Sequence, residues 1–254
     1  MASTSNLVTK AIVTGHTRGL GAACVDALRA RGIDVLGLAR SSRTPASAGA
    51  HAQALGTFAE VELDLADSAQ LAQWLAGETL AAFLRGAQRA LLINNAGTVN
   101  PIGPCDTQAP NEVGRAVALN VAAPLMLASA FAAATASVPD RRIAHVSSGA
   151  ARNAYAGWSV YCATKSALDH HARAAALDSQ RGLRIASVAP GVVDTDMQGE
   201  IRRVDDARFP QRARFEEMKR TGQLSSPEQA ANKFVGYLLS DAFGEAPTAD
   251  VRSL

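Results

Sequence analysis

The chain has little cysteine, few aromatic residues and almost no net charge. Its three cysteines, Cys24, Cys105 and Cys162, stand far apart, and none forms a CxxC pair. That spacing argues against a disulfide framework and a zinc site and favours a reducing compartment. The 25 basic and 23 acidic side chains nearly cancel, giving a formal charge of +2. This balance predicts neither nucleic acid nor an anionic membrane as a partner.

Targeting signals are also missing. Residues 1–10 show no basic segment followed by an apolar one, so no signal peptide is predicted. Residues 116–139 carry no charge over 24 residues, but they are rich in Ala and include Asn120 and Pro124. We therefore expect a buried helix there rather than a membrane span. The 254 residues, 48% apolar, predict a soluble cytoplasmic protein of one domain, residues 1–254.

What the chain has instead is a regular alternation of two kinds of segment. Short β-branched apolar runs cover residues 11–14, 35–39, 57–63, 91–94, 143–147 and 185–189, and Ala/Leu-rich stretches cover 20–31, 68–84, 111–136, 161–180 and 227–240. Such alternation is typical of βαβ units with a parallel sheet. Because crossovers are right-handed, it predicts an α/β fold with a single doubly wound (Rossmann) parallel sheet and helices on both faces.

Two segments do not fit the alternation. Residues 41–56 are rich in Ser, Ala and Gly and are expected to form a loop. Residues 190–225 mix charges, Gly and Pro without a clear period. A long irregular segment in a compact domain is usually a functional lid or is disordered, and a flexible lid around Met197 is our hypothesis here.

Three glycines, Gly15, Gly19 and Gly21, follow the first predicted strand and open a helix. Glycine lets the chain turn tightly and lets N–H groups at a helix N-terminus approach a pyrophosphate. The spacing differs from the G-x-G-x-x-G fingerprint, and a tight strand-to-helix turn would produce the same pattern. The position between the first strand and its helix favours a dinucleotide site.

Two arginines indicate which dinucleotide is bound. Folds that select NAD place an acid near the end of the second strand, whereas Arg accommodates the 2′-phosphate of NADP. Here the strand ends in Ala39 and Arg40, and Arg18 stands within the glycine loop. Either arginine alone reads as a surface residue, but together they predict a preference for NADP(H) over NAD(H).

The densest group of reactive side chains lies between His145 and Lys165. Tyr161 and Lys165 are four residues apart, so on a helix they share one face. A neighbouring ammonium is expected to lower the pKa of the phenol and make Tyr161 a usable proton donor near neutral pH. Ser148, at the end of a predicted strand, is placed to hydrogen-bond a carbonyl oxygen. Alone, a Tyr-x-x-x-Lys pair is usually structural.

In their order along the chain, these motifs resemble those of the short-chain dehydrogenase/reductase family. The resemblance rests on residues 14–21, Asp64, the Asn94–Gly97 run, Ser148 with Tyr161 and Lys165, and Pro190-Gly191 followed by Thr195. It implies a catalytic tetrad of Asn120, Ser148, Tyr161 and Lys165. The cofactor contacts it implies are Gly15, Thr17, Arg18, Gly19, Leu20, Gly21, Arg40, Asp64, Leu65, Asn95, Ala96, Gly97, Tyr161, Lys165, Pro190, Gly191, Val193 and Thr195.

The family's mechanism would give each tetrad residue a role. Tyr161 would donate the proton in reduction, and Ser148 would orient the carbonyl. Lys165 would bind the nicotinamide ribose, and Asn120 would hold a water in a proton relay. The cofactor carries the hydride, and the protein supplies orientation and electrostatics.

The chain's ending, residues 244–254, and residues 157–161 are similar to the sepiapterin reductase and benzil reductase branch of the family. That branch implies NADPH-dependent reduction of a small or medium ketone or diketone. Tyr155, Trp158 and Met197 are candidate walls of the substrate pocket, with ordinary packing as the alternative.

Other activities stay open. A 3-oxoacyl-thioester reductase or an alcohol dehydrogenase of the same family would carry the same tetrad, and a non-catalytic NADP(H)-binding sensor is a third possibility. The resemblance also implies a homodimer or homotetramer that pairs through residues 116–136 and the Tyr161 helix. His145, His170 and His171 lack ligand spacing, so no metal site is predicted.

Overall fold

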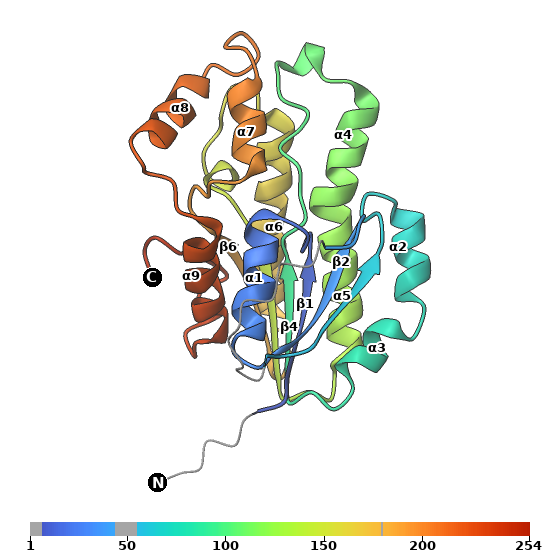
Figure 1. Ribbon diagram of the computed structural model, residues 1–254. Helices are drawn as coiled ribbons and strands as arrows, with labels where there is room; N and C mark the ends of the chain where they lie inside the picture. Colours follow the sequence, from blue (N-terminus) through green and yellow to red (C-terminus); the bar gives the residue numbers. More distant parts are fainter. Residues whose placement is uncertain (1–6, 44–54, 179) are drawn as a thin grey trace.

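A seven-stranded parallel sheet forms the centre of the computed structural model (Figure 1). The structure describes residues 7–43, 55–178 and 180–254. The strand order is β3-β2-β1-β4-β5-β6-β7, so the chain moves outward from β1 first in one direction and then in the other. The predicted doubly wound sheet is confirmed. Its switch point lies between β1 and β4, where folds of this kind bind ligands at the carboxyl ends of the strands.

The strands and helices alternate along most of the chain. The strands are β1 (Thr9–Thr14), β2 (Asp34–Ala39), β3 (Phe58–Glu62), β4 (Arg89–Asn94), β5 (Asp140–Val146), β6 (Leu183–Ala189) and β7 (Thr248–Asp250). The helices are α1 (Gly19–Arg29), α2 (Ser68–Leu75), α3 (Thr79–Leu84), α4 (Pro110–Val117), α5 (Ala123–Ala134), α6 (Ser159–Leu177), α7 (Asp196–Arg203), α8 (Arg212–Arg220) and α9 (Pro227–Leu239).

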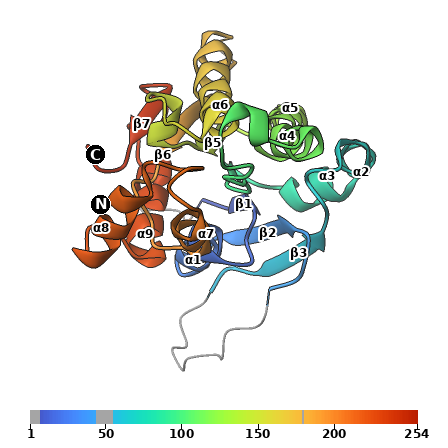
Figure 2. The same ribbon diagram turned by 90° about the horizontal axis from the view of Figure 1, so that it is seen from above.

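Helices cover both faces of the sheet (Figure 2). On one face α1 and α9 pack against the strands, with Leu28 and Phe234 in the core between them. On the other face α2, α3, α5 and α6 contribute side chains such as Leu71 and Phe131 to a second core. Strands buried on both faces need continuous apolar runs, as in β1, β2 and β4, whereas the edge strand β3 alternates apolar residues with Glu60 and Glu62.

Two of the predicted helices are interrupted. The stretch 68–84 forms α2 and α3, because the helix ends at Leu75 and Gly77 follows in the turn between them. Asp67 caps α2 by accepting from the N–H groups of Ala69 and Gln70. The stretch predicted over 111–136 is a helical run with a π-helical turn at Ala118–Ala122, between α4 and α5. Such turns are often found at functional sites.

The run Pro110–Ala134 also has the length and apolar composition of a membrane-crossing helix. That is weak evidence for a membrane span, because the core helices of soluble proteins have the same composition. In this fold its α5 portion packs on the sheet through Leu127 and Phe131, both of which are buried. The structure therefore places one face of the run in the core.

The expectation of an irregular segment over 190–225 is wrong. Two helices, α7 and α8, form there, and both lie above the carboxyl ends of the strands (Figure 1). The short strand β7, paired with β6 through three residues, was not predicted either, because its Thr-Ala-Asp sequence has no apolar run. Most of the loop expected over residues 41–56 lies outside the described residues.

Candidate functional site

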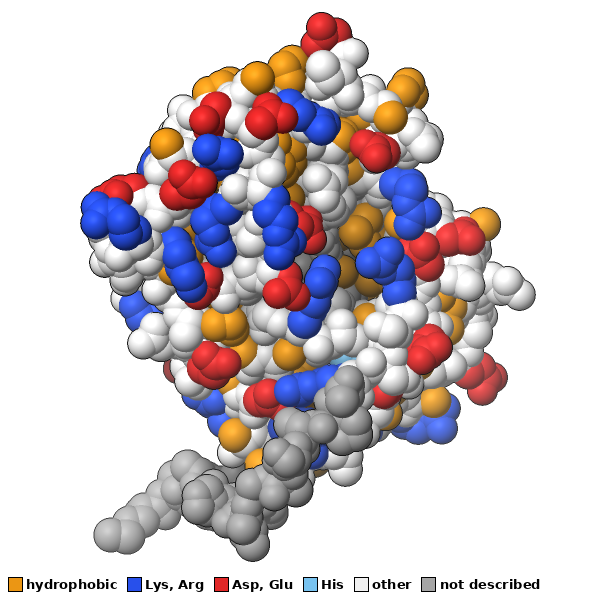
Figure 3. Space-filling model, turned by 45° about the horizontal axis from the view of Figure 1, so that its top comes forward, with side chains coloured by type: hydrophobic (Ala, Val, Ile, Leu, Met, Phe, Trp, Pro, Cys, Tyr) orange, Lys and Arg blue, Asp and Glu red, His pale blue; other side chains and the backbone are white. Residues whose placement is uncertain are grey.

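A cleft of about 700 Å³ opens at the carboxyl ends of the strands. All eighteen of the predicted cofactor contacts line it, together with Ser148 and the candidate wall residues Tyr155, Trp158 and Met197. Asn120 does not line the cleft and lies buried beside it. Figure 3 shows a hollow on this side of the molecule with Lys and Arg side chains around it, interspersed with acidic ones.

One end of the cleft is built by the glycine loop between β1 and α1. Gly15 and Gly19 adopt φ values of +65° and +56°, which favour glycine. At Gly21 a Cβ atom would lie 2.1 Å from the carbonyl oxygen of Gly15, so no side chain fits there. The loop thus keeps its backbone bare and close-packed where α1 begins, the arrangement that receives a phosphate at a helix N-terminus.

The glycine loop is fixed to the end of β4 by hydrogen bonds. The Thr14 hydroxyl accepts from the N–H groups of Asn95 and Ala96, both at 2.9 Å. The Asn95 side-chain amide donates to the carbonyl oxygens of Thr14 at 2.9 Å and Gly15 at 3.2 Å. The Asn-Asn-Ala-Gly run at the end of β4 therefore has a structural role. Its residues Asn95 and Ala96 anchor the glycine loop from the neighbouring strand.

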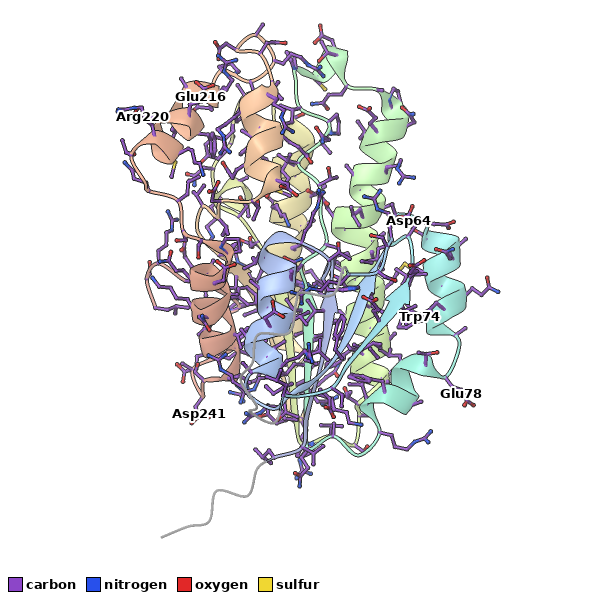
Figure 4. The ribbon with its side chains drawn as sticks, in the orientation of Figure 1. Asp64, Trp74, Glu78, Glu216, Arg220 and Asp241 are labelled. Atoms are coloured by element: carbon purple, nitrogen blue, oxygen red, sulfur yellow. The ribbon has the colours of Figure 1, made fainter. Side chains whose placement is uncertain are left out.

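Charged side chains surround the glycine loop. Arg40 follows β2 and is exposed at the cleft. Arg18 forms an exposed ion pair with Asp196 at 3.1 Å, which links the glycine loop to the start of α7. Asp64 follows β3 beside α4, where its carboxylate lies 3.3 Å from the Arg115 guanidinium (Figure 4). Arg18 and Asp64 therefore have protein partners in this structure, and Arg40 has no ion-pair partner among the described residues.

The other end of the cleft holds the candidate reactive group. Tyr161 and Lys165 lie on successive turns of α6, with the Lys165 ammonium 5.8 Å from the Tyr161 ring centre. The same ammonium donates to the carbonyl oxygen of Val146 at 2.7 Å, at the end of β5. Ser148, just beyond β5, hydrogen-bonds Tyr161 and accepts from the N–H of Ala150 at 3.2 Å. The predicted trio is therefore assembled by two elements, β5 and α6.

The expected lowering of the Tyr161 pKa is wrong for this structure. Burial raises the pKa of Tyr161, and the hydrogen bond from Ser148 only partly opposes it. Burial also lowers the pKa of Lys165 to about 8, while the charge of Asp169 acts in the opposite direction. The spacing of Tyr161 and Lys165 in the sequence indicates that they are neighbours, but it does not indicate that both are buried. Burial disfavours the charged form of each side chain.

Asn120 stands in the π-helical turn and is buried. Its side-chain amide donates to the carbonyl oxygen of Thr98 at 2.8 Å and to the Thr164 hydroxyl at 3.2 Å. Its oxygen accepts from the N–H of Thr98 at 2.9 Å. A Cβ at Gly97 would lie 3.2 Å from this oxygen and 3.7 Å from the Lys165 nitrogen. Asn120 and Lys165 therefore both lie next to Gly97, and the π-helical turn carries Asn120.

Aromatic side chains form the wall beyond Tyr161. Trp158 stacks on Phe209 with ring centres 4.5 Å apart, and its ring lies 5.3 Å from that of Tyr161. Tyr155 meets Trp158 edge-on at 5.5 Å, and Met197 from α7 packs against the same cluster. The predicted wall residues are therefore part of one apolar cluster that is also exposed to the cleft.

Several residues of this wall were not predicted. Phe215 and Met218 of α8, Gln198 of α7 and Arg252 near the chain end all line the cleft. Phe215 and Met218 are three residues apart, so a helical reading of 212–220 would have placed both on one face. Nothing in the sequence signals Arg252, which reaches the cleft because β7 adds to the sheet beside β6.

Comparison with known proteins identifies relatives over most of the chain. Residues 9–206 match the family described as short chain dehydrogenase. Benzil reductase ((S)-benzoin forming) of Bacillus subtilis is 32% identical over 89% of this chain and 92% of its own length, and its counterpart in Bacillus cereus is 36% identical over 60% of this chain and 63% of its own. Sepiapterin reductase of Meriones unguiculatus is 32% identical over 94% of each chain.

A solved short-chain dehydrogenase/reductase from Burkholderia vietnamiensis is 52% identical to this chain. The match covers 97% of this chain and 98% of that one, with a TM-score of 0.68. Members of this family bind a nicotinamide cofactor. The chain belongs to the short-chain dehydrogenase/reductase family of oxidoreductases.

Proposed function

We propose that this protein is an NADPH-dependent carbonyl reductase that acts on ketones or diketones. The observation that carries the proposal is the single cleft that joins the glycine loop at one end to Ser148, Tyr161 and Lys165 at the other. Similarity to benzil and sepiapterin reductases over most of the chain supports this substrate class.

The residues present fit a dinucleotide. A Cβ at Gly15 or Gly21 would clash with neighbouring backbone, so the loop keeps its N–H groups bare where α1 begins, as a phosphate at a helix N-terminus requires. Gly97 likewise presents no side chain beside Asn120 and Lys165. Arg40 supports a preference for NADP over NAD, because an arginine rather than an acid follows β2. Among the described residues the Arg40 guanidinium has no ion-pair partner, so it is free to bind a phosphate. When bound, the cofactor supplies the hydride that reaches the carbonyl carbon.

The protein's own contribution is a proton and its placement. The Tyr161 hydroxyl, kept protonated by its raised pKa, donates its proton to the carbonyl oxygen as negative charge develops there. Ser148, hydrogen-bonded to Tyr161, holds that oxygen in position. Lys165 brings positive charge to the same face of α6, where it favours the tyrosinate left after transfer. The aromatic cluster around Trp158 gives the wall beyond Tyr161 an apolar surface.

A direct assay tests the proposal. Consumption of NADPH and NADH is followed with benzil, sepiapterin, small diketones and an acetoacetyl thioester side by side. We expect turnover of the diketones with NADPH and little with the thioester. Preference for the thioester would assign the chain to acyl-chain reduction, and NADPH binding without turnover of any carbonyl would point to a sensor.

We also propose that the protein is a cytoplasmic homodimer or homotetramer, with a small carbonyl compound as its other partner. Less than half of the most apolar part of the Pro110–Ala134 run is buried within the chain, and Val117 on it is 44% exposed. A second copy packed on this run and on α6 would cover that apolar surface. Light scattering that gives a particle of 26.3 kDa would contradict this assembly.

A further inference from the structure

Beneath the tyrosine end of the cleft lies a buried carboxylate that the proposed mechanism does not use. Asp169 follows Lys165 by one turn of α6 and is 2% exposed. Residues four apart lie on the same face of a helix, so Tyr161, Lys165 and Asp169 form one row. A carboxylate so far removed from water is retained only where partners compensate for its lost hydration.

Asp169 has such partners on separate elements. The Ser147 hydroxyl donates to one carboxylate oxygen at 2.6 Å, and the Arg152 guanidinium donates to the other at 3.3 Å. Arg152 also donates to the carbonyl oxygen of Ala249 in β7 at 3.1 Å. The carboxylate is therefore held by Ser147, just past β5, and by Arg152, which is itself hydrogen-bonded to β7.

The Lys165 ammonium has little else to stabilise its charge. Val146 offers a carbonyl oxygen from β5, and Tyr161 presents its ring from α6. His145, also on β5, is neutral near pH 7, because burial lowers its pKa to about 3. From the side of β4, Gly97 and the Asn120 amide lie near the ammonium, and neither carries a charge.

We propose that Asp169 is a positioning residue that keeps Lys165 in its ammonium form inside the buried site, with Ser147 and Arg152 holding the carboxylate in place. The direction of its effect agrees with this reading, since the charge of Asp169 raises a Lys165 pKa that burial has lowered to about 8. The catalytic consequence rests on the proposed reductase function. The state of Lys165 does not, because it is a property of the protein without ligand.

The chain is well suited to a direct measurement. It has only four lysines, Lys10, Lys165, Lys219 and Lys233, so Cε signals of ¹³C-labelled lysine can be assigned by single substitutions. Titrating these signals by NMR in the ligand-free, full-length protein gives the midpoint for Lys165. The other three lysines, none of which is buried, serve as internal references.

Asp169→Asn keeps the shape of the side chain and can still accept from Ser147, but it removes the charge. We expect the Lys165 midpoint to fall by at least about one pH unit, as for loss of an opposite charge nearby. Ser147→Ala removes one of the two partners that hold the carboxylate but keeps its charge, so the Lys165 midpoint should fall by less than in Asp169→Asn. A midpoint unchanged in Asp169→Asn would overturn the proposal.

Arg152→Gln should shift the Lys165 midpoint in the opposite direction to Asp169→Asn. It removes a cation that shares the Asp169 carboxylate, so the Lys165 midpoint should rise. This variant decides the matter if Asp169→Asn does not fold, because a fall or no change in Arg152→Gln contradicts the proposal on its own. Failure of the reductase function would appear elsewhere, as absent NADPH consumption with a normal Lys165 titration.

Discussion

The two ends of the cleft differ in the kind of contact that holds them together. At the glycine-loop end, contacts run through the backbone and through small residues, as in the hydrogen bonds that join Thr14 and Asn95. At the tyrosine end, the contacts are made by buried ionisable side chains, among them Lys165 and Asp169. The structure of the glycine-loop end therefore depends mainly on close packing, and that of the tyrosine end depends mainly on buried charges. Substitutions at the two ends should fail in different ways.

The largest effect is expected at the tyrosine end from Tyr161→Phe. This change removes the proton donor and leaves the ring, which packs 5.3 Å from Trp158. General acid catalysis contributes about 10²- to 10⁴-fold, so turnover of a diketone should fall by that factor. NADPH affinity, measured by fluorescence titration, should change little. Full activity in this variant would remove Tyr161 from the mechanism and with it the contrast between the two ends.

The matching test of the glycine-loop end is Gly21→Ala. A Cβ there would lie 2.1 Å from the Gly15 oxygen and 2.4 Å from the Asn95 amide nitrogen, so the loop must move. We expect a loss of about 1–3 kcal/mol in the free energy of unfolding, as for overpacking elsewhere. NADPH affinity should fall with it, because the same backbone receives the phosphates.

Gly236→Ala on α9 is the control for that substitution. Apart from its chain neighbours and the backbone of its own helix, no atom of the described residues lies within 4 Å of a Cβ built at this position in α9. Alanine is favoured over glycine in a helix by up to about 1 kcal/mol, so this variant should be as stable as the wild type or more so. Equal melting temperatures for the two variants would show that the glycine loop is not tightly packed.

Arg40→Ala tests charge at the end that shape otherwise governs. If Arg40 binds the 2′-phosphate, the loss of a charged hydrogen bond of about 1.5 kcal/mol should weaken NADPH binding roughly tenfold. NADH has no such phosphate, so its Kd should hardly change. Parallel titrations with both cofactors give the ratio. A similar loss for both would mean that Arg40 does not discriminate between them.

The difference between the two ends also explains what the sequence alone could predict. Gly15, Gly19 and Gly21, and the pair Tyr161 and Lys165, are local patterns whose spacing reports their geometry directly. The fold class followed from the alternation of segments for the same reason.

Contacts between distant segments were not predictable in this way. The carboxylate of Asp169 meets Ser147 only because α6 packs on β5, and the direction of the Tyr161 pKa depends on burial rather than on spacing. Phe215 lines the cleft because α8 packs over the cleft. Most residues of α8 are charged, so its sequence shows no clear apolar period from which a helix could be predicted.

The smallest effect concerns a second buried titratable group near the tyrosine end. His145 is fully buried, with its ring nitrogens 3.1 Å from the Asn94 amide nitrogen and 3.0 Å from the His171 ring. Burial lowers its pKa from 6.5 to about 3, so below pH 6.5 the unfolded chain binds a proton that the folded chain does not. Stability should therefore fall as pH drops from 6.5 to 5, by about 1 kcal/mol per pH unit. This corresponds to roughly 2–4 °C in melting temperature for each kcal/mol.

Two variants test the origin of this pH dependence. In His145→Gln the free energy of unfolding should depend less on pH than in the wild type. In His170→Gln, whose side chain is exposed on α6, the pH dependence should stay as in the wild type. Equal slopes in the two variants would show that acid sensitivity does not come from the buried groups of the tyrosine end.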